Sequence, residues 1–309
     1  MTRLGHALVT GGAGFIGSHL ARALVAGGSA VTVLDNLSTG RRDNVPDGAR
    51  LIVGDVRSDA DVRSALEGVD VVFHLAAQVT IRGSFDRCRE DLETNLLGTV
   101  TLIRAIPKGQ VRWLTLASSM AVYADAETPR PVPESHPTLP LSPYGVGKLA
   151  AERVAGLLLA ELGVPLSVVR YFNTYGPGQA YTPYVGVMTI FTTELLRGAP
   201  FIRVFGDGEQ TRDFTHVGDI VAGTLATVGR PPGTFNLGTG VGTTVNALAR
   251  MLRDRLSPAT GIRHVPAHPG ELRYSIADIT RAREALGYAP AHRLSDDVDD
   301  VVASVRERL

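Results

Sequence analysis

Short apolar runs alternate with amphipathic stretches through the first half of the chain. The apolar runs, rich in β-branched residues, predict strands at 7–10, 31–34, 51–53, 69–75, 113–117 and 166–171. The stretches between them have helical periodicity and predict helices at 15–26, 59–66, 92–106 and 144–162. Near-continuous apolar strands separated by helices are typical of a parallel sheet with helices on both faces. We therefore predict an α/β fold with a doubly wound parallel sheet.

The texture of the chain changes after Tyr171. Glycine, proline and tyrosine cluster between Asn173 and Tyr184, and the alternation of strands and helices becomes irregular. We expect residues 1–170 to form one domain and residues 171–309 a smaller C-terminal α/β lobe. Segments within 214–240 are expected to return to the main sheet. The proline- and glutamate-rich stretch 124–141 is predicted to be a surface loop.

Composition limits the partners that the protein can have. The formal net charge is zero, so the chain has no electrostatic footprint for nucleic acid or an anionic membrane. No run of about 20 apolar residues can span a bilayer, and the N-terminus does not resemble a signal peptide. Cys88 is the only cysteine, which excludes an internal disulfide and fits a reducing cytoplasm. We expect a cytoplasmic protein with no nucleic-acid or membrane partner.

A metal site is not expected either. The eight histidines include no close pair with the spacing of metal ligands. His74 ends a predicted strand, and we interpret it as a core histidine with satisfied hydrogen bonds.

A glycine-rich turn, GGAGFIG at 11–17, follows the first predicted strand and opens the first predicted helix. Gly11 permits the tight turn, Gly14 lets the backbone approach a pyrophosphate, and Gly17 lets the helix pack closely on the strand. The helix N-terminus then offers N–H groups and a positive dipole end to the phosphates. This order of strand, turn and helix predicts a Rossmann-type dinucleotide site. Its first predicted contacts are Gly11, Gly14, Phe15, Ile16 and Gly17.

The second predicted strand ends at Asp35. A carboxylate there can accept hydrogen bonds from both ribose hydroxyls and would repel a 2′-phosphate, so Asp35 favours NAD over NADP. Two alternatives stay open: Asp35 caps only the turn 36–40, or Arg41 and Arg42 hold the 2′-phosphate of NADP. Asp55 ends the third predicted strand and is expected to bond the adenine amino group or to cap the next helix.

Tyr144 and Lys148 lie one helical turn apart, so their side chains share one face of the predicted helix. A free phenol has a pKa of about 10 and is a poor base at neutral pH. A nearby ammonium and a positive nicotinamide ring would lower that pKa and favour the phenolate. Ser119 follows another predicted strand, where its hydroxyl could bond a reacting oxygen. We predict Ser119, Tyr144 and Lys148 as the catalytic residues.

Together these motifs resemble the extended short-chain dehydrogenase/reductase family. The resemblance is carried by the glycine turn, Asp35, Asp55-Val56, His74-Leu75-Ala76-Ala77, Asn95, Ser118-Ser119 and the YGVGK run at 144–148. Within the family, the chain most resembles the NAD-dependent nucleotide-sugar epimerases and dehydratases, especially those of the UDP-galactose 4-epimerase kind. The resemblance implies NAD as cofactor, contacted also by Asn36, Ser38, Thr39, Gly40, Val56, Leu75, Ala76, Ala77, Asn95, Tyr144, Lys148 and Tyr171.

The implied reaction is C4 epimerisation of a UDP-hexose or UDP-N-acetylhexosamine through a 4-keto intermediate. Met120 and Ala121 stand where related dehydratases have an Asp-Glu pair, and neither side chain can transfer a proton. Epimerisation is therefore favoured over dehydration and decarboxylation. The alternatives are a UDP-glucuronic acid 4-epimerase, a 4-keto-sugar reductase, and a catalytically silent sensor of NAD or nucleotide sugars.

The resemblance also implies where the nucleotide sugar binds. Arg212 is the expected diphosphate ligand, since a guanidinium matches phosphate geometry. Family members often have a phosphate-clamping arginine at the position of His268, so Arg273 is expected to supply that charge. A small Ser275 at a gate position would leave room for an N-acetyl group. The full set of implied substrate contacts is Ser119, Met120, Tyr144, Phe172, Asn173, Val187, Arg203, Phe205, Arg212, Arg273 and Ser275.

Family members are commonly homodimers through the helices that correspond to 92–106 and 144–162. The second of these helices is apolar on more than one face. We therefore expect a homodimer.

Overall fold

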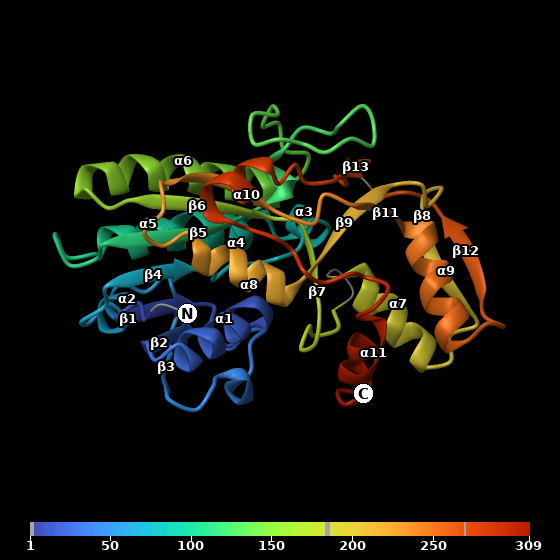
Figure 1. Ribbon diagram of the computed structural model, residues 1–309, viewed down its shortest axis with the longest axis horizontal. Coiled ribbons are helices and arrows are strands. Elements are labelled where there is room, and N and C mark those ends of the chain that lie inside the picture. Colours follow the sequence, from blue (N-terminus) through green and yellow to red (C-terminus); the bar gives the residue numbers. More distant parts are fainter. Residues whose placement is uncertain (1–2, 183–185, 269) are drawn as a thin grey trace.

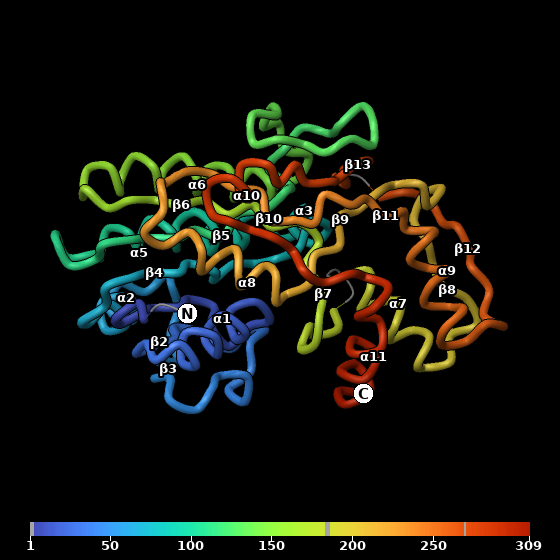
Figure 2. Tube along the Cα trace, viewed as in Figure 1, coloured from blue at the N-terminus to red at the C-terminus, as the bar shows by residue number. Residues whose placement is uncertain are grey.

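The computed structural model describes residues 3–182, 186–268 and 270–309. Tyr184, the end of the predicted glycine, proline and tyrosine cluster, lies outside the described residues. Two lobes are visible, a larger one around a wide sheet and a smaller one beside it (Figure 1). Figure 2 follows the chain from the N-terminus in the larger lobe to the C-terminus, which lies in the smaller lobe.

The larger lobe is built on a seven-stranded sheet of order β10-β6-β5-β4-β1-β2-β3. Every neighbouring pair in it is parallel, which confirms the predicted doubly wound sheet. The strands are β1 (His6–Thr10), β2 (Ala30–Asp35), β3 (Ala49–Val53), β4 (Val71–His74), β5 (Trp113–Ser119), β6 (Leu166–Tyr171) and β10 (Gly233–Leu237).

Alternate residues of the central strands face two separate cores, because side chains alternate across a sheet. Ala7 and Val9 of β1 pack in the core that contains α1 and α8, and Leu8 packs in the core beneath α2, α5 and α6. Helices thus cover both faces, as the apolar strands require. The helices and helical turns of this lobe are α1 (Phe15–Ala26), η1 (Arg42–Asn44), α2 (Asp59–Ala65), α3 (Gly83–Asp86), α4 (Cys88–Leu92), η2 (Glu93–Leu97), α5 (Gly98–Arg104), η3 (Met120–Val122), α6 (Pro143–Leu162), α8 (Val217–Ala226) and α10 (Thr280–Leu286).

The region 92–106, predicted as one helix, has a different geometry from the one expected. α4 continues into the π-helical turn η2, and α5 follows. Single π turns inside α-helices often occur at functional sites. Asn95 lies in this turn, and its side chain is discussed with the site below.

The smaller lobe combines two short sheets with three helices. One sheet has the order β11-β9-β13 with β7 also paired to β9, and the other pairs β12 with β8. Their apolar side chains and those of α7, α9 and α11 form a separate core. The elements are β7 (Asn173–Tyr175), α7 (Val187–Leu196), β8 (Phe201–Phe205), β9 (Thr211–His216), β11 (Gly242–Thr244), α9 (Val245–Leu256), β12 (Gly261–Val265), β13 (Tyr274–Ser275) and α11 (Val298–Arg306).

The segment near 214–240 divides between the two lobes. β10 lies at the edge of the large sheet beside β6, and α8 packs against α1. Phe214, which was expected to return to the large sheet, instead lies in β9 of the smaller one. The predicted surface loop 124–141 contains only an isolated bridge from Val132 to Ala277. Among the described residues, no helix is long and apolar enough to cross a bilayer.

Candidate active site

The carboxyl ends of five parallel strands, β1, β2, β4, β5 and β6, open on one cavity between the lobes. The cavity has a volume of about 970 Å³. It lies where the strand order reverses between β1 and β4, the point at which open α/β sheets bind ligands. The predicted site residues that line it are Gly11, Gly14, Phe15, Ile16, Gly17, Asp35, Asn36, Ser38, Thr39, Val56, Leu75, Ala76, Ala77, Ser119, Met120, Tyr144, Lys148, Tyr171, Phe172, Asn173, Val187, Arg203, Phe205 and Arg212.

The glycine turn forms a cradle that side chains would fill. Gly11 has a φ of 70°, and a Cβ there would lie 2.8 Å from the Ala76 backbone nitrogen. A Cβ on Gly17 would overlap the Gly11 carbonyl oxygen, so α1 starts directly against the turn. Gly14 is the N-cap of α1, and no side chain among the described residues caps it. The first N–H groups of α1 therefore point to a cavity of the right chemistry for a pyrophosphate.

Asp35 both holds the turn and faces the cavity. Its two carboxylate oxygens accept hydrogen bonds from the backbone N–H groups of Ala13 and Leu37, each at 2.9 Å. A Cβ on Gly40 would come within 2.9 Å of the same carboxylate, so Gly40 packs behind the cavity lining. Arg41 lines the cavity, but its exposed guanidinium pairs with Asp43 at 3.7 Å. The carboxylate end of β2 is thus the polar group best placed for a ribose.

Asp55 and Asn95 lie behind the cavity wall. Asp55 accepts from Arg57 Nη2 at 2.8 Å and from Asn36 Nδ2 at 2.9 Å. The hydrogen bonds from Arg57 hold the pKa of Asp55 well below its usual range. Neighbouring Gly54 and Val56 line the cavity instead.

Asn95 holds the loop that follows β4. Its side-chain oxygen accepts from Gln78 N at 2.9 Å, and its amide donates to Gln78 O at 3.1 Å. The same amide donates to Asp91 Oδ1 at 3.0 Å. Asn95 is buried in the π-helical turn, and it positions the backbone of 75–78 rather than facing the cavity itself.

His74 is a core histidine with both ring nitrogens bonded, as predicted. Its Nδ1 pairs with Thr10 Oγ1 at 2.7 Å, and its Nε2 with Thr99 Oγ1 at 3.0 Å. Burial lowers its pKa to about 3, so the ring is neutral at physiological pH. Among the described residues, no group of acidic, histidine or cysteine side chains could hold a metal ion.

Ser119, Tyr144 and Lys148 come together on the cavity wall. Ser119 ends β5, while Tyr144 and Lys148 lie in the first turns of α6. α6 begins cleanly because the Ser142 side chain caps Gly145 N at 3.1 Å. The Tyr144 backbone N–H donates to Ser84 Oγ at 3.1 Å, which fixes the start of the helix against α3. All three catalytic candidates are buried.

The electrostatics of the pair differ from the simple expectation that Lys148 lowers the Tyr144 pKa. Burial raises the pKa of Tyr144 to about 12, and a hydrogen bond from Ser119 acts against this increase. Burial lowers the pKa of Lys148 to about 8, opposed by the charges of Glu152 and Asp91. Desolvation therefore outweighs the ammonium in the protein alone, and Tyr144 is a neutral phenol. A further positive charge in the cavity is needed to favour the phenolate.

A buried ion pair supports the catalytic helix from behind. Glu152, one turn beyond Lys148, accepts from Arg170 Nη2 at 2.6 Å and from Nε at 3.0 Å. Ser118 also donates to Glu152, next to the catalytic Ser119. The sequence analysis did not identify this pair. Its signal is Arg170, a charged residue inside the otherwise apolar strand β6.

The substrate side of the cavity contains polar atoms without partners. Asn173 Oδ1 and Gln210 Oε1 are buried and have no hydrogen-bond partner among the described residues. Both residues line the cavity. Buried polar atoms are nearly always bonded, so these two are suited to a ligand. Gln210 was missed, and only its place two residues before Arg212 could have indicated it.

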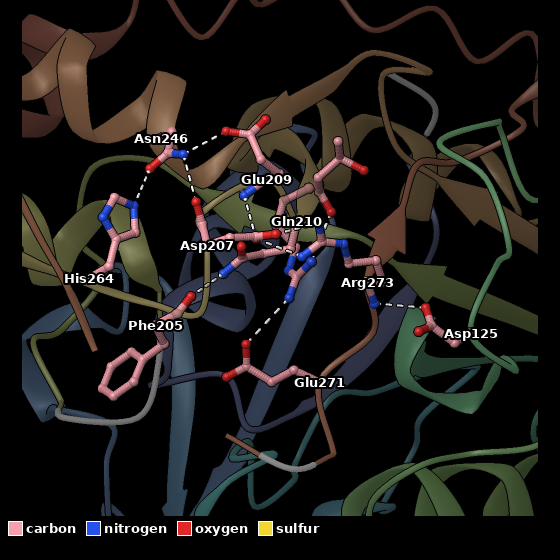
Figure 3. A network of polar contacts seen from close by, with 11 residues as sticks. Asp125, Phe205, Asp207, Glu209, Gln210, Asn246, His264, Glu271 and Arg273 are labelled. Atoms are coloured by element: carbon pink, nitrogen blue, oxygen red, sulfur yellow. Dashed lines mark hydrogen bonds and ion pairs between the residues drawn. The ribbon is translucent and has the colours of Figure 1, made fainter. Parts of the chain in front are cut away.

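Two predicted substrate residues lie elsewhere. Arg273 makes a two-pronged ion pair with Asp207, at 2.7 and 2.8 Å, and is not among the lining residues described (Figure 3). Its backbone N–H donates to Asp125 at 2.7 Å. Ser275 pairs in β13 with Arg212 of β9 and is buried outside the cavity lining. Neither can take its predicted role in this arrangement, and the argument for an N-acetyl pocket from Ser275 is lost.

Arg82 and Glu271 are cavity residues that the sequence analysis missed. Arg82 Nη2 lies 2.6 Å from Glu271 Oε1, and Arg212 Nη2 donates to Glu271 Oε2 at 3.4 Å. Figure 3 shows the Glu271 carboxylate pointing into the network around Gln210. Asp213 and Asp219, which could have paired with Arg212, instead accept backbone N–H groups of other segments. No local pattern predicts these contacts, because Arg82 is nearly 190 residues from Glu271 (|i−j| = 189).

The fold and the site define a Rossmann enzyme that uses a dinucleotide together with a serine, a tyrosine and a lysine. The model of the NAD-dependent epimerase/dehydratase family matches residues 7–238. The chain is 36% identical to UDP-glucose 4-epimerase of Mycolicibacterium smegmatis, over 97% of this chain and 98% of the relative. The chain therefore belongs to the NAD-dependent epimerase/dehydratase family, and its cofactor is NAD.

Solved structures agree closely with the fold. UDP-glucose 4-epimerase of Thermotoga maritima, determined with UDP-glucose, has a TM-score of 0.94 at 34% identity, covering 98% of this chain and 99% of that one. UDP-glucose 4-epimerase of Thermus thermophilus, determined with NAD, has a TM-score of 0.92 at 32% identity, covering 98% and 100%.

Replacing Asp35 with alanine should weaken NAD binding and reduce discrimination against NADP. The change removes an acceptor for the ribose hydroxyls, and each hydrogen bond to a charged group contributes about 1.5–3 kcal/mol. We expect NAD affinity to fall by about 10- to 100-fold, measured by titration of cofactor-stripped protein. Asp43→Ala is the matched control, since its exposed carboxylate pairs only with Arg41 among the described residues. Unchanged preference for NAD in Asp35→Ala would contradict the role of Asp35.

Proposed function

We propose that this protein is an NAD-dependent 4-epimerase of UDP-sugars, with a UDP-hexose as its substrate. The observation that carries the proposal is the convergence of Ser119, Tyr144 and Lys148 on one cavity that also receives the α1 N-terminus. The same cavity extends to Arg212 in the smaller lobe, where a diphosphate can be held. A redox centre and an anion site thus share one space.

The neighbours of Ser119 support epimerisation over dehydration or decarboxylation. Met120 and Ala121 are buried directly after it, and neither can donate or accept a proton. Elimination of water from the sugar needs an additional acid and base beside the reacting carbons. Ser119, Tyr144 and Lys148 are sufficient for oxidation at C4 and its reversal.

The residues present suit NAD. Gly11 and Gly17 leave room for a pyrophosphate at the uncapped start of α1, and the Asp35 carboxylate faces the ribose end of the cavity. When bound, NAD supplies a hydride acceptor and a positive ring. That ring is the further charge that a buried Tyr144 requires, so the phenolate is favoured only in the oxidised complex.

The chain's residues then divide the work at C4. The Tyr144 phenolate accepts the proton of the sugar 4-hydroxyl, while the C4–H bond gives up its electron pair as hydride. Ser119 donates a hydrogen bond to the developing 4-keto oxygen. After the keto sugar turns over, the hydride returns to the opposite face of C4 and Tyr144 returns the proton. Atoms and electrons balance over the cycle, with no net oxidation.

We also infer a homodimer in the cytoplasm. Leu97, Val146 and Leu157 are large apolar side chains that remain at least 49% exposed on η2 and α6. Pairing this surface with a second copy would bury them, as exposed apolar patches often mark interfaces. The free, exposed Cys88 supports a reducing compartment.

The proposed function is tested by incubating the purified protein with UDP-glucose, UDP-N-acetylglucosamine and UDP-glucuronate separately and following each by NMR. We expect UDP-glucose to convert to UDP-galactose without added cofactor or loss of mass. Loss of water or CO₂ would overturn the interpretation of Met120 and Ala121. Turnover of UDP-glucuronate alone would replace the hexose with a uronic acid.

A further inference from the structure

We propose that Arg82, which reaches across the cleft from the larger lobe, is the second phosphate-binding arginine and works as a pair with Arg212. The inference rests on the proposed function, because it takes the ligand to be a nucleotide diphosphate. Arg82 would occupy the role that a resemblance to the family gives to the position of His268, and that Arg273 does not fill.

Two guanidinium groups already hold one planar anion in this cavity. Arg82 donates through Nε to Glu271 Oε1 at 2.6 Å, and Arg212 donates to Oε2 of the same carboxylate at 3.4 Å. The side chains of Arg82 and Glu271 are each 23% exposed, so solvent and ligands can reach them. A carboxylate between two guanidiniums is the arrangement that a phosphate group also prefers. Glu271 thus keeps both arginines extended toward the space where a diphosphate would lie.

The ring of Phe205 fixes where Arg82 points. The Arg82 guanidinium carbon lies 4.2 Å from the centroid of the Phe205 ring. The His268 ring contacts the same phenylalanine, with centroids 4.7 Å apart. The residue at the position of the family arginine therefore packs on Phe205, and the positive charge over that ring comes from Arg82. A guanidinium over an aromatic face is held in place without losing its in-plane N–H donors.

The local charge balance favours an added anion. Arg82 and Arg212 bring two positive charges and Glu271 one negative charge, and Arg273 is neutralised by its ion pair with Asp207. Burial and the positive charges of Arg82 and Arg273 lower the pKa of Arg212, while Glu271 and Asp125 act in the opposite direction. A diphosphate brought between the two arginines would relieve this repulsion. It would also join the lobes, because Arg82 precedes α3 and Arg212 lies in β9.

The alternative is that Arg82 only ties the lobes together through Glu271. The two readings differ in a double-mutant cycle. If Arg82 serves Glu271 alone, Arg82→Gln should have no further effect on ligand binding in a Glu271→Gln background. If Arg82 binds phosphate, its removal should weaken binding in both backgrounds.

The test uses full-length protein loaded with NAD and measures the affinities of UDP and UMP by calorimetry. We expect Arg82→Gln to weaken UDP by about 10- to 100-fold, the effect of losing hydrogen bonds to a charged group. UMP should weaken less, and Arg82→Lys should lie between, because an ammonium keeps the charge without the fork. In turnover of UDP-glucose, the KM should rise while kcat changes by less than about threefold, since the lost contact is far from C4. Arg89→Gln is the matched control, with an exposed arginine paired only to Glu93 among the described residues.

UDP affinity in Arg82→Gln equal to that of the unaltered protein would overturn the inference, and so would loss of its effect in the Glu271→Gln background. In either case continued epimerisation of UDP-glucose by the unaltered protein would leave the proposed function standing. Failure of the unaltered protein both to bind UDP and to turn over UDP-glucose would overturn both proposals.

Discussion

Replacing Tyr144 with phenylalanine is expected to lower kcat by about 10²- to 10⁴-fold, the usual contribution of a positioned acid–base group. The phenol is the group on the cavity wall that can take a proton from the sugar hydroxyl and return it. Ser119 cannot replace it, because a serine hydroxyl is a far weaker acid than a phenol. NAD content, read from the absorbance of denatured protein, should stay the same, since phenylalanine keeps the shape of the side chain.

Tyr123→Phe is the matched control for this experiment. The Tyr123 hydroxyl donates to Asn236 Oδ1 at 2.7 Å and lies outside the cavity, and burial raises its pKa to about 12. We expect that variant to lose about 1 kcal/mol of stability and little activity. Normal turnover by Tyr144→Phe would remove Tyr144 from the chemistry. Equal losses in both variants would point to a folding defect.

Gly17→Ala should have the second large effect, through the backbone rather than the chemistry. The added Cβ would overlap the Gly11 carbonyl oxygen and lie 2.8 Å from its carbonyl carbon, so α1 would have to move off the turn. We expect the free energy of unfolding to fall by about 3 kcal/mol or more and NAD to be lost on purification. Urea unfolding and the cofactor content of the purified protein measure the two consequences.

The matched control is Gly156→Ala, on the exposed side of α6. No described heavy atom lies within 4 Å of a Cβ built at Gly156. Because glycine is unfavourable inside a helix, this change should stabilise the protein by about 0.5–1 kcal/mol. A Gly17→Ala protein that unfolds like the unaltered one and keeps its NAD would contradict the close packing of α1 on the turn.

The sequence was most informative where structure depends on local pattern. The predicted helix at 15–26 and strand at 166–171 have the bounds of α1 and β6, because apolar periodicity and the flanking glycines define them. The residues at the ends of those strands were also predictable. Parallel strands bring their carboxyl ends to one edge, so Asp35, Ser119 and the glycine turn meet there whatever the loops do.

Residues that depend on contacts between the lobes could not be predicted in the same way. Arg82 faces Glu271 only because a loop after β4 meets a segment before β13. Arg273 was expected at the phosphates, yet Asp207 lies close enough to take its guanidinium. Local pattern contains no information about such distant partners, and a resemblance transfers positions without their new neighbours.

The electrostatics of the catalytic pair show a similar limit. One helical turn between Tyr144 and Lys148 is visible in the sequence, and it suggests a lowered phenol pKa. The depth of burial is not visible, and burial raises that pKa to about 12. Chemistry at Tyr144 therefore depends on the charge of the cofactor more than the spacing alone suggests.

The most direct test of the central claim is the fate of deuterium in UDP-glucose labelled at C4. If hydride leaves C4 for NAD and returns to the opposite face, the UDP-galactose formed should keep the deuterium at C4 and gain no hydrogen from solvent. NMR of the product after incubation with the NAD-containing protein gives the answer. UDP-galactose with hydrogen at C4 would contradict hydride return, and the absence of any UDP-galactose would contradict 4-epimerisation of this sugar.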